Sequence, residues 1–202
     1  SAVLNINGGE GSNTVTITAL KSISSVNITA GAGDDTVVAD QMDIRGSFTA
    51  NLGDGANKLT TSGTNPVNVG GLVRYVGGSG VDTVSVGASA ATTIGGSLTI
   101  WAGDGDNDID TGFATTGVVK VGGALAVTTG SGADSIFIDS TTTGGSMVVS
   151  AGDGDNTFNV TLFGTSKAGV GLYYTGGSGN DFVTVGTAAF PVNFGGSVVI
   201  NT

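Results

Sequence analysis

The chain has 202 residues, of which 39% are hydrophobic and 11% charged, and its net charge is −10. This composition can bury a core and is not that of a disordered chain, while the acidity opposes binding to nucleic acid or anionic lipid, which need clustered Lys and Arg. Cysteine and histidine are absent from the sequence, which excludes disulfides, thiolate metal sites and imidazole chemistry. With no apolar run of about 18 residues, we expect no membrane insertion.

Three short strands are expected in each of a series of repeats. An alternating strand such as 98–102 comes first, a glycine-rich turn follows, and a second strand such as 83–86 comes after that turn. A variable segment then leads to a third strand, such as 118–121. Alternation with β-branched residues is typical of half-buried strands, and no window carries the periodic stripe and caps of a helix.

The glycine-rich turn is the landmark that defines the repeat. Its pattern is Gly-x-Gly-x-(Asp/Asn)-x-apolar, and the copies begin at Gly9, Gly31, Gly53, Gly78, Gly103, Gly130, Gly152 and Gly177. The intervals of 22 to 27 residues are typical of a solenoid. We therefore predict an all-β fold: a right-handed, three-sided parallel β-helix of about eight coils, the hand following from the crossover rule.

Period-two alternation assigns the inner and outer faces of the strands. In the first strand, Leu98, Ile100 and Ala102 are predicted to point inward. The inward column of the second strand is predicted to be Val15, Val37, Leu59, Val84, Ile109, Ile136, Phe158 and Val183. Eight coils at about 4.8 Å each give a rod about 40 Å long.

One continuous solenoid domain, 1–202, is predicted, built from two four-coil blocks at about 1–100 and 101–202. The motif glycines 31, 53 and 78 recur 99 residues later, which indicates duplication of a block. The segments 3–6 and 197–201 read as first strands without polar caps, which terminal coils need. We therefore expect this chain to be a segment of a longer array, or to stack end to end on copies of itself.

The fifth letter of the motif alternates between Asn and Asp without exception. The residues are Asn13, Asp35, Asn57, Asp82, Asn107, Asp134, Asn156 and Asp181. They share the phase of the inward column, so each side chain is expected to turn into the corner of its coil. Carboxylates stacked at about 4.8 Å would repel one another, and interleaved Asn both doubles their separation and supplies NH₂ donors. The first interpretation is therefore an inward Asn/Asp ladder that satisfies turn N–H groups.

A second interpretation rests on a resemblance. Residues 77–85, GGSGVDTVS, resemble the calcium-binding nonapeptide of the RTX family of secreted bacterial proteins, and residues 176–184 fit equally well. The resemblance implies calcium bound between successive turns through the Asp and loop carbonyls. Here one motif occurs in each long coil, whereas the family repeats its motif every nine residues.

Carried over by position, the resemblance implies a set of calcium ligands. The ligands would be Asp35, Asp82, Asp134 and Asp181, with the ladder asparagines, Asn107 among them, lending amide oxygens. Further acids in the same turns have the opposite phase and should point outward, where they form shallow calcium sites or solvate the edge: Glu10, Asp54, Asp104, Asp106, Asp153 and Asp155.

The expected function is structural: a stalk or fibre segment of an extracellular bacterial surface or secreted repeat protein of the adhesin kind, with calcium as its one candidate cofactor. The alternative is a calcium- or glycan-binding module, in which the outward aromatics Trp101, Tyr173 and Phe182 contact a sugar. Ice binding is the weaker alternative, because Lys58 and Asp108 interrupt the outward Thr rows. An enzyme is not expected, since the basic residues are scattered and no histidine can act as a base.

Overall fold

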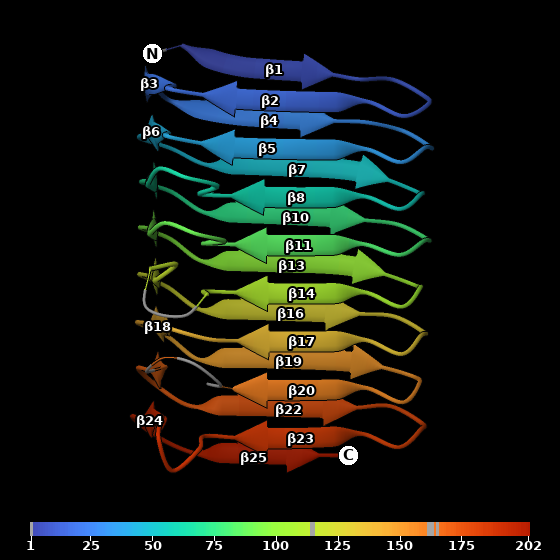
Figure 1. The fold of residues 1–202 in the computed structure, drawn as a ribbon, viewed down its shortest axis with the longest axis vertical. Helices are drawn as coiled ribbons and strands as arrows, with labels where there is room; N and C mark the ends of the chain where they lie inside the picture. Colours follow the sequence, from blue (N-terminus) through green and yellow to red (C-terminus); the bar gives the residue numbers. More distant parts are fainter. Residues whose placement is uncertain (1, 114–115, 161–163, 165) are drawn as a thin grey trace.

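The structure, a computed structural model, describes residues 2–113, 116–160, 164 and 166–202. These residues form a three-sided parallel β-helix in which every coil gives one strand to each of three sheets (Figure 1). The described part of the chain contains no helix, hence none that could cross a bilayer. The predicted all-β, three-sided solenoid is confirmed, and its right-handed winding stays a prediction.

Each sheet runs the length of the rod. Within the described residues, sheet 1 consists of β1 (Val3–Asn7), β4 (Ser25–Thr29), β7 (Phe48–Gly53), β10 (Val73–Gly77), β13 (Leu98–Gly103), β16 (Leu125–Thr129), β19 (Met147–Gly152), β22 (Leu172–Gly176) and β25 (Val198–Asn201). Sheet 2 consists of β2 (Thr14–Thr18), β5 (Thr36–Asp40), β8 (Lys58–Thr61), β11 (Thr83–Val86), β14 (Asp108–Thr111), β17 (Ser135–Ile138), β20 (Thr157–Val160) and β23 (Phe182–Val185). Sheet 3 consists of β3 (Lys21–Ile23), β6 (Asp43–Ile44), β9 (Val67–Val69), β12 (Thr92–Ile94), β15 (Val119–Val121), β18 (Thr141–Thr143), β21 (Lys167–Ala168) and β24 (Asn193–Phe194).

We number the coils 1 to 8 from the N-terminus, so that coil 1 contains β1, β2 and β3, coil 5 contains β13, β14 and β15, and β25 begins a ninth. The strands of sheets 1 and 2 run in opposite directions across the view of Figure 1, and sheet 3 is seen end-on at the left. The turns from sheet 1 to sheet 2 therefore form one edge of the rod, opposite sheet 3.

The inward columns of the strands form the core as the alternation predicts. Leu98, Ile100 and Ala102 are fully buried. The second-strand column is buried from Val37 to Phe158, and only its two end members, in coils 1 and 8, are partly exposed. Parallel pairing keeps equivalent residues in register from coil to coil, for example Val84 with Ile109. The apolar side chains of each coil therefore pack on those of the coil before it.

Length variation is confined to the connection from sheet 2 to sheet 3, as predicted, and a carboxylate fastens one such loop. Asp40 accepts hydrogen bonds from the backbone N–H groups of Thr64 and Asn65 and from both their side chains, at 2.8–3.1 Å. Burial alone would raise its pKa, but these bonds lower the pKa of Asp40 to about 2. This loop is thus tied to the coil before it.

Candidate functional site: the glycine-rich edge

The turn from sheet 1 to sheet 2 brings the alternating Asn and Asp residues into one column along the edge. Six of the eight are buried, and the two at the ends, Asn13 and Asp181, are partly exposed. The predicted inward orientation is confirmed. The side chains take this orientation because they occupy the same phase as the apolar column that begins two residues later.

Every link of the column is a hydrogen bond from one coil to the next. The Oδ1 atom of each residue accepts the backbone N–H of the ladder residue one coil earlier, so that Asp82 N–H donates to Asn107 Oδ1 at 2.9 Å and Asn107 N–H donates to Asp134 Oδ1 at 2.9 Å. The other five links measure 2.8–3.2 Å. The column is a continuous ladder that satisfies one turn N–H group in each of coils 1 to 7.

The asparagine amides hold the turns of their own coils. Asn107 Nδ2 donates to the carbonyl oxygens of Gly103 at 3.0 Å and Gly105 at 2.8 Å, and it also lies 2.9 Å from Asp134 Oδ1. Asn57 and Asn156 make the same two carbonyl contacts in coils 3 and 7. A carboxylate cannot donate these bonds, so the Asn positions are chemically distinct from the Asp positions.

The backbone alternates together with the side chains. In the odd-numbered coils, which carry Asn, both motif glycines have positive φ, for example 82° at Gly103 and 113° at Gly105. In the even-numbered coils, which carry Asp, only the second glycine does, for example 129° at Gly80. The structural unit is therefore a pair of coils, with one turn of each kind.

Each ladder carboxylate keeps a second oxygen on the interior side. Four Oδ2 atoms are buried without a hydrogen-bond partner among the described residues: those of Asp35, Asp82, Asp134 and Asp181. Burial raises the pKa of Asp82 to about 6, and it also raises the pKa of Asp134, in both cases against the lowering effect of hydrogen bonds. The raised pKa values make Asp82 and Asp134 easier to protonate than exposed carboxyl groups.

A tyrosine hydroxyl faces the ladder carboxylate in coil 4 and another does so in coil 8. The Tyr75 hydroxyl is buried beside Asp82, although the pair falls short of hydrogen-bond geometry. Burial and then the charge of Asp82 raise the pKa of Tyr75 far above its usual range, and Tyr174 responds in the same way to burial and Asp181. Both hydroxyls stay protonated and available as donors.

The outer acids point away from the core, as predicted, and bind the following coil. Asp104 Oδ1 accepts the backbone N–H of Ser131 at 2.8 Å and its hydroxyl at 2.9 Å, and these bonds lower the pKa of Asp104. Equivalent bonds join Asp153 to Ser178. Asp106 and Asp155 accept one coil-to-coil N–H each, from Ala133 and Asn180, at 2.8 Å. The outer acids thus reinforce the contact from each odd coil to the even coil after it.

A calcium ion requires six to eight oxygen ligands, and the edge offers carboxylate, amide and carbonyl oxygens. Each ladder carboxylate has Oδ1 engaged by an N–H group, and its neighbours in the column are Asn residues. Across the described ranges, no cluster of three or more Asp, Glu, His or Cys side chains is close enough to hold a metal ion. The described side chains alone do not complete a calcium shell, and loop carbonyls would have to supply most of it.

Sequence reasoning missed two features of the site. The alternation that places Leu98 and Ile100 inside also places Tyr75 and Tyr174 inside, but it does not predict that their hydroxyls face Asp82 and Asp181. Their inward phase seven residues before each Asp was a usable signal. The alternation predicts that Asp108 and Asp110 share the outward face of β14, but not that burial, with the charges of Asp108 and Asp139, raises the pKa of Asp110 to about 6.

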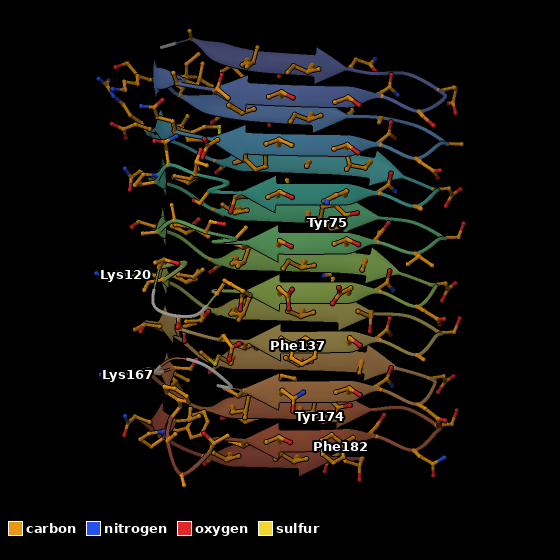
Figure 2. All side chains as sticks on the ribbon, viewed as in Figure 1. Tyr75, Lys120, Phe137, Lys167, Tyr174 and Phe182 are labelled. Atoms are coloured by element: carbon orange, nitrogen blue, oxygen red, sulfur yellow. The ribbon has the colours of Figure 1, made fainter. Side chains whose placement is uncertain are left out.

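The outward aromatics do not form one surface. Trp101, on sheet 1, is 44% exposed and is covered on one side by the Arg74 guanidinium, 4.4 Å from the ring centre. Tyr173 lies on sheet 1 three coils further on, whereas Phe182 projects from sheet 2 (Figure 2).

Comparison of the chain with protein-family models, with curated proteins and with solved structures finds no match. The interpretation of the edge therefore rests on its own geometry.

Proposed function

We propose that the chain is a structural rod segment, a stalk or fibre portion of an extracellular bacterial surface or secreted repeat protein. The observation that carries the proposal is the unbroken Asn/Asp ladder. Its polar side chains, which are the candidates for binding chemistry at this edge, are hydrogen-bonded from one coil to the next. Each coil also adds a parallel strand to all three sheets. Such a solenoid gains length by a fixed increment for each coil.

Solution scattering tests the rod, and antibody labelling tests the location. The isolated chain should scatter as a rod about 40 Å long, and antibodies raised against it should label intact cells of its source. Labelling that appears only after the cells are permeabilised would contradict the surface location, and a compact, isotropic scattering profile would contradict the rod.

Calcium binding is the second candidate, and the four buried Oδ2 atoms without partners favour it. A calcium ion bound between coils would stabilise the folded state by mass action. Because the ladder already joins the coils without metal, we expect the thermal unfolding curve to be the same in excess EGTA and in millimolar calcium. A lower melting temperature in EGTA would instead favour the calcium-binding module.

A further inference from the structure

Charge is segregated across the rod. Seven exposed acids lie on the glycine-rich edge, which carries no basic residue: Glu10, Asp34, Asp54, Asp104, Asp106, Asp153 and Asp155. Four of the six basic residues lie on the opposite side, on sheet 3 or its border with sheet 1: Lys21, Arg45, Lys120 and Lys167. Figure 2 shows Lys120 and Lys167 extending outward from sheet 3, away from the glycine-rich turns. One side of the rod is thus complementary to the other.

The charges on the two sides occur in the same coils except in coil 3, where Asp54 lies on the edge and the uncharged Asn68 on sheet 3. Lys21, Lys120 and Lys167 occupy one register column of sheet 3, in coils 1, 5 and 7. The edge of coil 1 carries one outward acid, and the edges of coils 5 and 7 carry two each. In coils 4, 6 and 8 the edge has no outward acid and sheet 3 has no basic residue in this column, with Thr93, Thr142 and Asn193 there instead. Coil 2 is mixed, because Asp43 and Arg45 both project from its sheet 3 side.

The direction of a neighbouring rod follows from this matching. If two rods lie parallel and level, Lys120 of one faces Asp104 and Asp106 of the other, and Lys167 faces Asp153 and Asp155. If the rods are antiparallel with coil 1 opposite coil 7, Lys120 faces only the single outward acid of coil 3. The paired acids of coil 5 then face Asn68. An antiparallel rod shifted to put coil 5 opposite coil 7 also pairs these charges, but it overlaps its neighbour over coils 4–8 only. The parallel arrangement is the one that places the doubly acidic coils opposite lysines with the whole length of both rods in contact.

We propose that copies of this chain associate side by side, parallel and level, with the glycine-rich edge of one rod against sheet 3 of the next. Each copy keeps a free edge and a free face, so the contact is heterologous and extends into an open row. Exposed ion pairs contribute little one at a time, so two copies bind weakly and a row of tethered rods gains from effective concentration. The inference rests on the proposed function and gives the rod a partner, a second copy of itself. The proposed rod function does not depend on this association.

Sedimentation with charge-reversal variants tests the contact. At about millimolar protein concentration, which weak binding requires, and at about 0.1 M salt, where the Debye length is about 10 Å, the chain should self-associate, and about 1 M salt should disperse it. Lys120→Glu should weaken self-association about tenfold. Lys58→Glu makes the same charge change on sheet 2 and should leave association unaltered. A chain that stays monomeric, or association that persists in high salt, overturns the proposal and leaves the scattering test of the rod untouched.

A mixing experiment assigns the two surfaces. Lys120→Glu/Lys167→Glu reverses the face, and Asp104→Asn/Asp106→Lys/Asp153→Asn/Asp155→Lys reverses the edge, because each edge pair then carries one positive charge. Each variant should associate less with itself than the parent does. Mixed together, the reversed edge and the reversed face should bind each other. Circular dichroism confirms that both variants are folded, and failure of two folded variants to associate on mixing overturns the assignment.

Cross-linking fixes the direction, because the chain has no cysteine of its own. Ala133→Cys on the edge and Thr142→Cys on sheet 3 both lie in coil 6, so a short bis-maleimide should join a mixture of the two. Thr93→Cys, two coils away on sheet 3, should react with Ala133→Cys far less. Equal yields for the two mixtures overturn the level, parallel arrangement.

Discussion

At the scale of single residues, Asn and Asp have different roles in the ladder, although the motif accepts either residue at this position. An Asn in the ladder accepts one N–H group and donates to two carbonyl oxygens of its own turn, as Asn107 does. An Asp accepts an N–H group and turns its other oxygen toward the core. Alternation keeps carboxylates two coils, about 10 Å, apart, so their repulsion stays small.

The buried carboxyl groups predict how stability depends on pH. The folded pKa of Asp82, about 6, exceeds its ordinary value of 3.8, so the native state holds the proton where the unfolded chain has lost it. Stability should therefore fall as pH rises from about 4 to about 6, by about 2 kcal/mol from this residue. In Asp82→Asn that fall should be smaller by the same amount, measured by urea unfolding across this range. Identical curves for the variant and the parent would show that burial does not raise the pKa of Asp82.

Replacing Asn107 by Asp tests both interpretations of the ladder. The new carboxylate would stand between Asp82 and Asp134 and would face the two glycine carbonyls that Asn107 now donates to. In EGTA at pH 7 we expect a loss of about 2–4 kcal/mol, part of which returns on acidification. Asn51→Asp, at an outward position of β7, is the control and should cost little. A gain of stability in calcium for Asn107→Asp would favour a metal site.

At the scale of the turn, the two backbone forms predict where a side chain cannot be added. Gly103 has a φ of 82°, and a Cβ on it would overlap the carbonyl oxygen of Gly78 in the coil before. Gly103→Ala should therefore lower the free energy of unfolding by about 2–4 kcal/mol. Gly63→Ala, at a loop glycine where the nearest atom to a Cβ is 4.0 Å away, should change it by less than about 1 kcal/mol. Equal effects in urea unfolding would contradict the close approach of the coils.

Most of the architecture could be predicted because every coil repeats the same apolar alternation and the same glycine-rich turn motif. Alternation of apolar residues placed Val84 and Leu98 inside, and the ladder residues share that phase, so their orientation followed too. The difference between odd and even turns could not be predicted, since Gly78 and Gly103 are the same letter of the motif and only the structure shows that their φ angles differ. The position of the Tyr75 hydroxyl beside Asp82 could not be predicted either, because it depends on how the turn folds back over the core.

At the scale of the whole molecule, the pair of coils is the unit of length. Deleting residues 58–107 removes two coils and leaves Asn57 next to Asp134, so the alternation of side chains and turns is preserved. Deleting residues 83–107 removes one coil and brings Asp82 next to Asp134, two even turns in succession. The second variant keeps more coils than the first, so its greater length alone would make it the more stable of the two.

The most direct test compares the melting temperatures and end-to-end distances of these two deletions with those of the full chain. Spin labels at Thr16 and Thr184, in one column of sheet 2, should lie about 10 Å closer in the two-coil deletion, which should melt cooperatively and near the full chain. The one-coil deletion should melt well below it. A one-coil deletion as stable as the two-coil deletion would show that alternation of Asn and Asp coils does not hold the rod together.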